Sequence, residues 1–197
     1  NGLRALKDMT PTAYEDALDG ITGAVSAAMG TGQGFAYNNT FGGAAVSLVY
    51  SDNLGATADR SDKGQDTTSA SANGSSSIGI TYPVADLGLT IFGGMGSQGQ
   101  GDGKDHDFNT LGAKYAVGPL TASYQRNGMD DTDDGVTGAV ANGADLTTVA
   151  YGVSFMVNDN LSISYAEHET STSLSNVDQE STGVSAAYSA GRMTLSV

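Results

Sequence analysis

The chain has 197 residues, of which 28 are glycine and none is cysteine or tryptophan, and its formal net charge is −14. This acidity argues against nucleic acid as a partner, because phosphate binding requires clustered lysine and arginine. The lack of cysteine excludes disulfides, thiol catalysis and cysteine-based metal sites. With 39 % hydrophobic and only 7 % aromatic residues, a soluble core would be poor. We therefore expect either an acidic extracellular β protein or a transmembrane β-barrel, whose strands are only half apolar.

The first 32 residues differ in pattern from the rest of the chain. Thr10 and Pro11 provide an N-cap and a proline at the first helical position, and Gly20 is expected to end the helix. The segment carries four acidic side chains, Asp8, Glu15, Asp16 and Asp19. Two interpretations stay open. One is a capped surface helix with solvated acids, and the other is a loop folded into a barrel lumen, where the acids would face basic wall residues across a narrow aqueous gap.

From residue 33 onward, small or polar residues alternate with apolar ones at a period of two, which is typical of strands with two different faces. In 160–168, for example, Leu161 and Tyr165 would share one face, and Ser162 and His168 the other. The repetition of this pattern predicts an all-β protein. The predicted strands are 33–39, 43–51, 75–82, 87–95, 108–116, 119–127, 146–156, 160–168, 180–189 and 191–197.

Short and long connections alternate between these strands. The short ones hold turn-forming residues and fall near 38–42, 83–86, 117–118, 158–159 and 189–191. The long ones are rich in glycine, serine, aspartate and threonine and fall near 52–74, 96–107, 128–145 and 169–179. This rhythm predicts an antiparallel up-and-down sheet with tight turns on one rim and long loops on the other.

The charged residues follow the same plan. All 22 acidic residues are expected in loops, in turns, at strand ends or in the N-terminal segment, and none in the middle of a strand. Lys114 and Arg192 fall on the polar face of a strand, so both are candidates for a wall opposite the acidic N-terminal segment. Arg126 shares the apolar face with Tyr124 but lies at the long-loop end, where a long side chain can reach a polar headgroup.

Aromatic residues gather at two levels of the predicted apolar face. Five stand just before a short turn, namely Tyr37, Tyr82, Tyr115, Phe155 and Tyr188. Four lie toward the long loops, namely Tyr50, Tyr124, Tyr151 and Tyr165. Two such rings are typical of a barrel at the two membrane interfaces. The alternative is a soluble β-sandwich, whose inward aromatic residues would also share one face.

No sequence motif indicates catalysis, so we do not expect an enzyme. His106 and His168 are the only histidines, and no nucleophile elbow, phosphate loop or HExxH motif is present. Two acidic loops, 102–107 and 130–135, contain fragments of a calcium-binding pattern without its full spacing. They are expected to be solvated, and no cofactor is expected unless one of them binds Ca²⁺ weakly. The candidate ligands are then Asp130, Asp131, Asp133 and Asp134.

The acidic run Asp8-Met9-Thr10-Pro11-Thr12-Ala13-Tyr14-Glu15-Asp16, with alternating hairpins such as 112–124 after it, resembles the general porins of the Gram-negative outer membrane. The likeness is greatest to the alphaproteobacterial type and covers essentially all 197 residues. It implies a sixteen-stranded transmembrane β-barrel, homotrimeric, surrounded by membrane lipid and lipopolysaccharide in the bacterial outer membrane. The implied function is passive diffusion of small hydrophilic solutes and ions through a water-filled channel.

Under this resemblance, residues 1–32 form an inward-folded constriction loop with a short helix and a lead into the first strand. Residues 33–197 form barrel strands with short periplasmic turns and long extracellular loops. The implied constriction residues are Asp8, Glu15, Asp16 and Asp19, facing Lys114 and Arg192. The chain shows no signal peptide, no first strands and no terminal aromatic residue, so a partial barrel of about ten strands is expected.

Three functions stay open. The first, and the preferred prediction, is a passive channel. The second is a plugged outer-membrane barrel that serves as an adhesin or a phage receptor through the long loops 52–74 and 128–145. The third is a soluble or surface-anchored, acidic, β-rich adhesin or calcium-binding protein. The aromatic residues at the strand ends argue against this third function, because a soluble fold does not need them.

Overall fold

The computed structural model describes residues 32–54, 57–59, 66–68, 72–100, 105–131, 145–173, 178–190 and 193–196. These residues form strands and turns, and none of them belongs to a helix that could cross a membrane. The predicted N-terminal helix lies outside this described part. The same holds for five of the candidate constriction residues, Asp8, Glu15, Asp16, Asp19 and Arg192.

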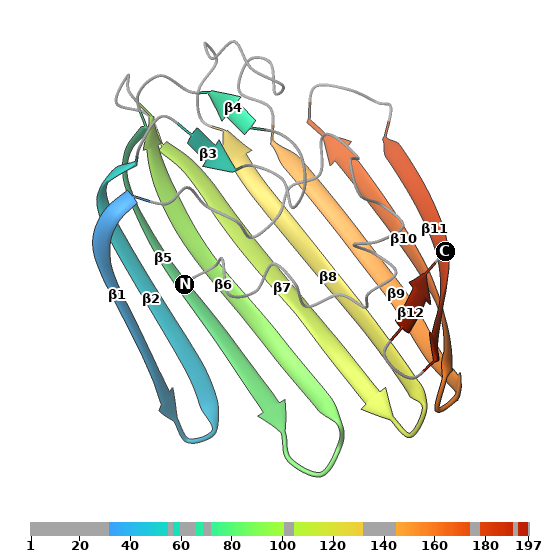
Figure 1. The fold of residues 1–197 in the computed structure, drawn as a ribbon. Helices are drawn as coiled ribbons and strands as arrows, with labels where there is room; N and C mark the ends of the chain where they lie inside the picture. The colour runs from blue at the N-terminus through green and yellow to red at the C-terminus, as the bar shows by residue number, and fades with distance from the viewer. Residues whose placement is uncertain are drawn as a thin grey trace.

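A single antiparallel sheet dominates the structure, and every strand in it pairs with the next sheet strand along the chain (Figure 1). In order across the sheet, the strands are β1 (Gly32–Phe41), β2 (Ala44–Leu54), β5 (Ala72–Val84), β6 (Leu89–Gln100), β7 (Asp105–Val117), β8 (Leu120–Asp131), β9 (Leu146–Asn158), β10 (Leu161–Thr172), β11 (Gln179–Ala190) and β12 (Met193–Ser196). In the described part, β1 and β12 each pair on one side only, so the sheet is open. The predicted all-β, up-and-down fold is confirmed, and closure into a barrel stays a prediction.

Each predicted strand matches one strand of this sheet, but several run further toward the long loops. β8 continues to Asp131 and β10 to Thr172, beyond the predicted ends at residues 127 and 168. The predicted loop 52–74 also contains a two-stranded ribbon of β3 (Thr57–Asp59) and β4 (Asp66–Thr68), which the sequence did not indicate. Polar residues extend a strand where a neighbouring strand supplies hydrogen-bond partners, and that pairing leaves no local signal in the sequence.

The predicted first turn, at 38–42, extends too far back into β1, and only Gly42 of that range lies in the turn. Asn38 lies inside β1, where its side-chain oxygen accepts a 2.6 Å hydrogen bond from the hydroxyl of Ser47 in β2. The turn consists of Gly42 and Gly43 instead, and both have positive φ, at 56° and 86°. A two-residue hairpin turn favours glycine at such positions because the left-handed region strains other residues.

Two further turns depend on individual residues. At Gly88 (φ 63°) the backbone oxygen accepts a 2.8 Å hydrogen bond from the Ala116 N–H, and a Cβ would lie only 2.1 Å from the Ala116 oxygen. Glycine is therefore required at this close approach. Asn158 caps the turn between β9 and β10, because its side-chain oxygen accepts the N–H groups of Asn160 at 2.9 Å and Leu161 at 3.0 Å.

One face of the sheet is buried and mostly polar, and we call it the polar face. Opposed pairs such as Thr110 with Asn127 and Thr148 with Thr170 share this face, because directly opposed residues of neighbouring strands point the same way. Its buried polar side chains are Ser47, Ser75, Gln98, Thr110, Ser123, Gln125, Asn127, Thr148, His168 and Thr170. The buried apolar side chains on the same face are Phe92, Phe108, Met129, Ala150 and Ala166.

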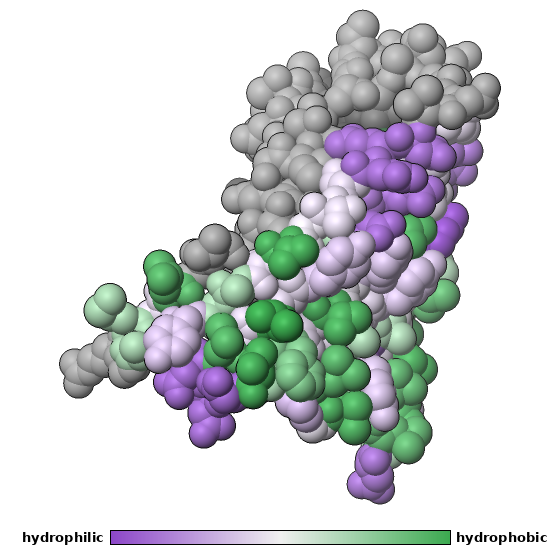
Figure 2. All heavy atoms as spheres, turned by 90° about the vertical axis from the view of Figure 1, so that its right-hand side faces the viewer, coloured by the Kyte–Doolittle hydropathy of each residue, from purple (hydrophilic) through white to green (hydrophobic). Residues whose placement is uncertain are grey.

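The opposite face, which we call the apolar face, carries most of the exposed large hydrophobic side chains. Among them are Leu48, Ile80, Ile91, Leu111, Val153, Ile163 and Val184. On the flank next to β11 and β12, apolar side chains gather over the middle and lower parts, while hydrophilic ones lie at the upper end and at the lower tips (Figure 2). Soluble proteins normally bury such apolar residues and expose polar ones, so this sheet has the reverse distribution.

Candidate functional site

The most ordered polar cluster lies on the polar face of β7 and β8. The hydroxyl of Thr110 donates to the side-chain oxygen of Asn127 at 2.6 Å. The amide nitrogen of Gln125 donates to the same oxygen at 2.9 Å and to the Thr110 hydroxyl at 3.2 Å. All three side chains are at most 5 % exposed. The three side chains bond to one another in a triangle, and these mutual bonds fix their orientation, because breaking a hydrogen bond of a buried group is costly.

A second cluster continues this row across β9 and β10. The hydroxyls of Thr148 and Thr170 lie 3.0 Å apart, and the Thr170 hydroxyl lies 3.2 Å from Nε2 of His168. Thr148 and His168 are 0 % and 1 % exposed. Asn127 of β8 is paired directly with Thr148, so the two clusters form one continuous polar layer across four strands.

Burial on the polar face changes along the strands. The layer described above lies in the half of the sheet toward the long loops. Toward the short turns, the polar-face side chains are only half-buried, for example Lys114, Thr121, Ser154 and Ser164. Ser164 lies 3.4 Å from Ser185 of β11, hydroxyl to hydroxyl. The polar face is therefore more open near the turns than near the long loops.

Ionisable groups are sparse on this face. Among the side chains that the structure describes there, only Lys114 and His168 can carry a charge, and both charges would be positive. Lys114 is paired with Thr90 and Ser123, which confirms its predicted place on the polar face. Its partners in the predicted constriction lie outside the described residues, so the constriction itself stays a prediction.

Two phenylalanines on the polar face were not anticipated. A Cβ at Gly112 would lie 2.3 Å from Cζ of Phe92, so the ring of Phe92 covers this glycine from the neighbouring strand. Phe108 is paired in the same way with Gly96 on β6 and with Met129 on β8. An aromatic ring laid over a cross-strand glycine stabilises a position that otherwise has no side chain to pack. The signal is a glycine opposite an aromatic residue, which becomes visible only once the register is known.

The apolar face carries one acidic side chain in mid-strand, and this contradicts the sequence prediction. Glu167 is the seventh residue of β10 and pairs with Tyr151 of β9. Tyr165 donates a 2.8 Å hydrogen bond to the Glu167 carboxylate, and Tyr151 also bonds to it. The carboxylate is tolerated because two phenol groups solvate it. The prediction failed because β10 is longer than the alternation indicated.

Other charged side chains of β8, β10 and β11 lie at the long-loop end of the apolar face. Arg126 is exposed there and donates a 3.2 Å hydrogen bond to the Thr147 hydroxyl, which agrees with its predicted place. Glu169 of β10 and Glu180 of β11 are directly opposed on this face, and both are exposed. Charges of both signs thus border the apolar side chains on this side.

All nine aromatic residues assigned to two rings are exposed. Those near the short turns are Tyr37 (37 %), Tyr82 (38 %), Tyr115 (43 %), Phe155 (40 %) and Tyr188 (50 %). Those toward the long loops are Tyr50, Tyr124, Tyr151 and Tyr165. A dry protein interior around them is thereby excluded for the described structure, while their role at a membrane interface stays a prediction.

The candidate calcium ligands are only partly described. Asp130 lies in β8 opposite Asp107, and Asp131 ends the same strand. Asp133 and Asp134 fall outside the described ranges. Within those ranges, no group of three or more histidine, aspartate or glutamate side chains could hold a metal ion. The calcium site therefore stays a prediction about a loop that is mostly not described.

No known protein family model matches the chain, and no curated protein sequence matches it either.

Proposed function

We propose that this sheet is part of the wall of a porin-type β-barrel that passes small hydrophilic solutes and ions across a bacterial outer membrane. The observation that carries the proposal is the reversed polarity of the two faces. An apolar face exposed over most of the sheet is costly in water and favourable against lipid chains. The porin resemblance adds the outer membrane and the homotrimer to the proposal.

Strand length and pairing support membrane insertion. A tilted strand needs about 9–11 residues to cross the hydrocarbon layer, and β5 to β11 each have 12 or 13 residues. Lipid offers no hydrogen bonds, so a spanning backbone must be paired on both sides. In the ten-stranded sheet, every strand from β2 to β10 has neighbours on both sides, and β11 pairs with β12 over Ala187–Ala190 within the described residues.

The polar face supports a water-filled passage on its short-turn side. Hydroxyl and amide groups can replace water around a solute without binding it strongly. The layer from Thr110 to Thr170 is at most 6 % exposed and offers a solute almost no accessible surface, whereas Ser154 and Ser164 are half-buried, so we place the water-accessible part of the passage along the half of the polar face near the turns. The described wall carries no carboxylate, so any preference for cations must arise elsewhere in the chain.

The test uses two neighbouring positions of β9 that face opposite ways. Val153 is 42 % exposed on the apolar face, and Ser154 lies half-buried on the polar face. The chain has no cysteine, so Val153→Cys and Ser154→Cys each create a unique thiol. Each variant of the full chain is reconstituted in lipid bilayers and treated with a charged, water-soluble thiol reagent or with a lipid-soluble one, and ion conductance is recorded.

The proposed pore predicts opposite reactivity at the two positions. The Ser154→Cys thiol should react with the charged reagent and the ion conductance should fall, whereas the Val153→Cys thiol should react only with the lipid-soluble reagent. A soluble adhesin would instead expose the Val153→Cys thiol to the charged reagent and show no conductance. A plugged barrel would protect Val153→Cys but also show no conductance.

A further inference from the structure

We propose that a hollow on the apolar face of β5, β6 and β7 binds one acyl chain of a membrane phospholipid. This inference rests on the proposed membrane location and names the partner of that face. The hollow has a volume of about 390 Å³, more than ten times the roughly 30 Å³ that one water molecule occupies in the liquid. The hollow is open to the surface, so it is a depression in the exposed apolar face rather than a gap inside a packed core.

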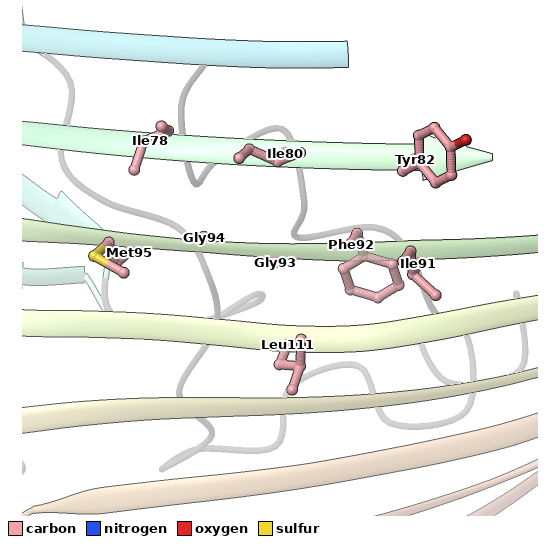
Figure 3. Close-up of a pocket in the computed structure, with 9 residues that line it drawn as sticks. All are labelled: Ile78, Ile80, Tyr82, Ile91, Phe92, Gly93, Gly94, Met95 and Leu111. Atoms are coloured by element: carbon pink, nitrogen blue, oxygen red, sulfur yellow. The ribbon is translucent and has the colours of Figure 1, made fainter. Parts of the chain in front are cut away.

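The hollow exists because one apolar-face position has no side chain. Gly93 of β6 lies directly between Ile80 of β5 and Leu111 of β7. The strand neighbours of Gly93 on the same face, Ile91 and Met95, stand at its two ends (Figure 3). The result is a slot along β6 whose floor is the Gly93 backbone and whose walls are branched side chains. Leu111 leans over the floor, since a Cβ at Gly93 would lie 3.4 Å from its Cδ1.

The chemistry of the slot fits an alkyl chain. None of the residues that line the slot is ionisable near neutral pH. The phenol of Tyr82 is the one polar side-chain group among them. The rim residues stand well out from the sheet, since Met95 is 65 % and Leu111 is 67 % exposed. A rigid sheet of a second copy would contact these two side chains first and leave the floor empty, which forfeits contacts. A flexible chain can reach the floor between them.

The position of the slot along the strand indicates which leaflet supplies the chain. β6 begins at Leu89 after the short turn, so Ile91 lies near the turn and Met95 near the middle of the strand. The slot thus covers the half of β6 on the short-turn side. Tyr82 lies at the turn end of the slot (Figure 3), where its hydroxyl can bond to a lipid headgroup or ester. We therefore assign the bound acyl chain to a phospholipid of the leaflet on the short-turn side.

The experiment uses tryptophan as a reporter, because the chain contains none. Leu111→Trp places the reporter on the slot wall, and Val184→Trp places it on the apolar face of β11, away from the slot. The two native side chains are matched in exposure, at 67 % and 72 %. The full chain is reconstituted in phosphatidylcholine vesicles that contain increasing fractions of a phosphatidylcholine brominated on its acyl chain, and tryptophan quenching is measured.

Both phosphatidylcholines offer the slot the same kind of acyl chain, so a chain held there is brominated in proportion to its fraction in the vesicle. We therefore expect quenching of Leu111→Trp to rise linearly, with half of the maximum at a brominated fraction of about one half, as for a single site, whereas Val184→Trp, which contacts several lipids, should be quenched steeply at lower fractions. Adding Gly93→Leu, which fills the slot, should remove the difference, whereas Ala186→Leu, which adds one carbon atom fewer outside the slot, should keep it. Circular dichroism of each variant checks that the sheet is retained.

The outcomes separate the two proposals. The same steep dependence on the brominated fraction at both reporters would overturn the acyl-chain site and leave the membrane-facing sheet intact. A Leu111→Trp reporter that is shielded from bromine while Val184→Trp is quenched would also overturn it, in favour of a second copy on the slot. Absence of quenching at both positions would mean that the proposed membrane location itself has failed.

Discussion

The two faces of this sheet are built from the same strands but differ in opposite ways in polarity and in burial. On the polar face, side chains such as Gln125 and Thr148 are buried and hydrogen-bonded to one another. On the apolar face, the side chains of Leu111 and Val184 are exposed and have no polar group that could form a hydrogen bond. Because neighbouring residues alternate between the faces, a change at one position and at the next tests both faces in the same backbone context.

The comparison teaches that burial and hydrophobicity are separate properties. In a water-soluble sheet, the buried face is apolar because removal of apolar area from water drives folding. Here the buried layer includes a histidine, two amides and several hydroxyls, so its stability must come from hydrogen bonds and close packing. The apolar face gains its stabilisation only if something other than water covers it.

The largest expected effect is that of a charge placed on the apolar face near mid-strand. Val153→Arg should lower the free energy of unfolding by about 2–4 kcal/mol in a bilayer, because a charge faces hydrocarbon. Ser154→Arg, on the polar face of the same strand, should cost less, since the guanidinium can reach water. Urea unfolding of the full chain in lipid vesicles measures both. If the apolar face contacts water, Val153→Arg should change stability by no more than about 0.5 kcal/mol.

Next in size is the packing of Phe92 over Gly112. Gly112→Ala adds a Cβ that would lie 2.3 Å from Cζ of Phe92 and 2.5 Å from the backbone oxygen of Tyr124. We expect the free energy of unfolding to fall by about 1–3 kcal/mol because the site becomes overpacked. Combining Gly112→Ala with Phe92→Ala should recover part of this loss, and a double-mutant cycle measures the coupling. Strictly additive effects would mean that the ring does not cover the glycine.

A smaller effect is expected from the hydrogen bonds of the polar layer. Thr148→Val removes the hydroxyl that bonds to Thr170 at 3.0 Å but keeps the side-chain shape. The free energy of unfolding should fall by about 0.5–1.5 kcal/mol, which is the net contribution of one hydrogen bond. The control is Ser76→Ala, which removes an exposed hydroxyl on the apolar face and should stay within about 0.5 kcal/mol. Equal losses at both positions would remove the energetic distinction between the faces.

The sequence predicted the fold well because period-two alternation is a local property. The two faces of 160–168 follow from the spacing of Ile163, Tyr165 and their polar neighbours, and the structure confirms that assignment. The number and order of the strands in the sheet follow in the same way. Turn positions were less certain, because a turn such as Gly42–Gly43 depends on which residues pair across the hairpin.

The candidate site was less predictable because it depends on register. Alternation places Thr110, Asn127 and Thr148 on the polar face, but it does not show that they lie in one row, which requires the pairing of three strands. The cover of Gly112 by Phe92 and the slot at Gly93 also arise from cross-strand neighbours. The mid-strand place of Glu167 was missed for the same reason, since its strand extends by pairing rather than by alternation.

The smallest predicted effect concerns two carboxylates at the long-loop end of the apolar face. Glu169 and Glu180 are directly opposed on neighbouring strands, and like charges in that position repel. Glu169→Gln should therefore raise stability by less than about 1 kcal/mol. The gain should vanish in about 1 M salt, where the screening length falls to roughly 3 Å. Chemical unfolding at low and high salt measures both values.

The matched variant is Glu167→Gln, two residues earlier on the same strand and face. Its carboxylate accepts hydrogen bonds from Tyr165 and Tyr151, so the loss of charge should weaken those bonds and lower stability. One strand thus carries two glutamates whose neutralisation should act in opposite directions. If Glu169→Gln is destabilising as well, the opposed pair cannot be repulsive, and a shared proton or cation must hold Glu169 and Glu180 together at the rim.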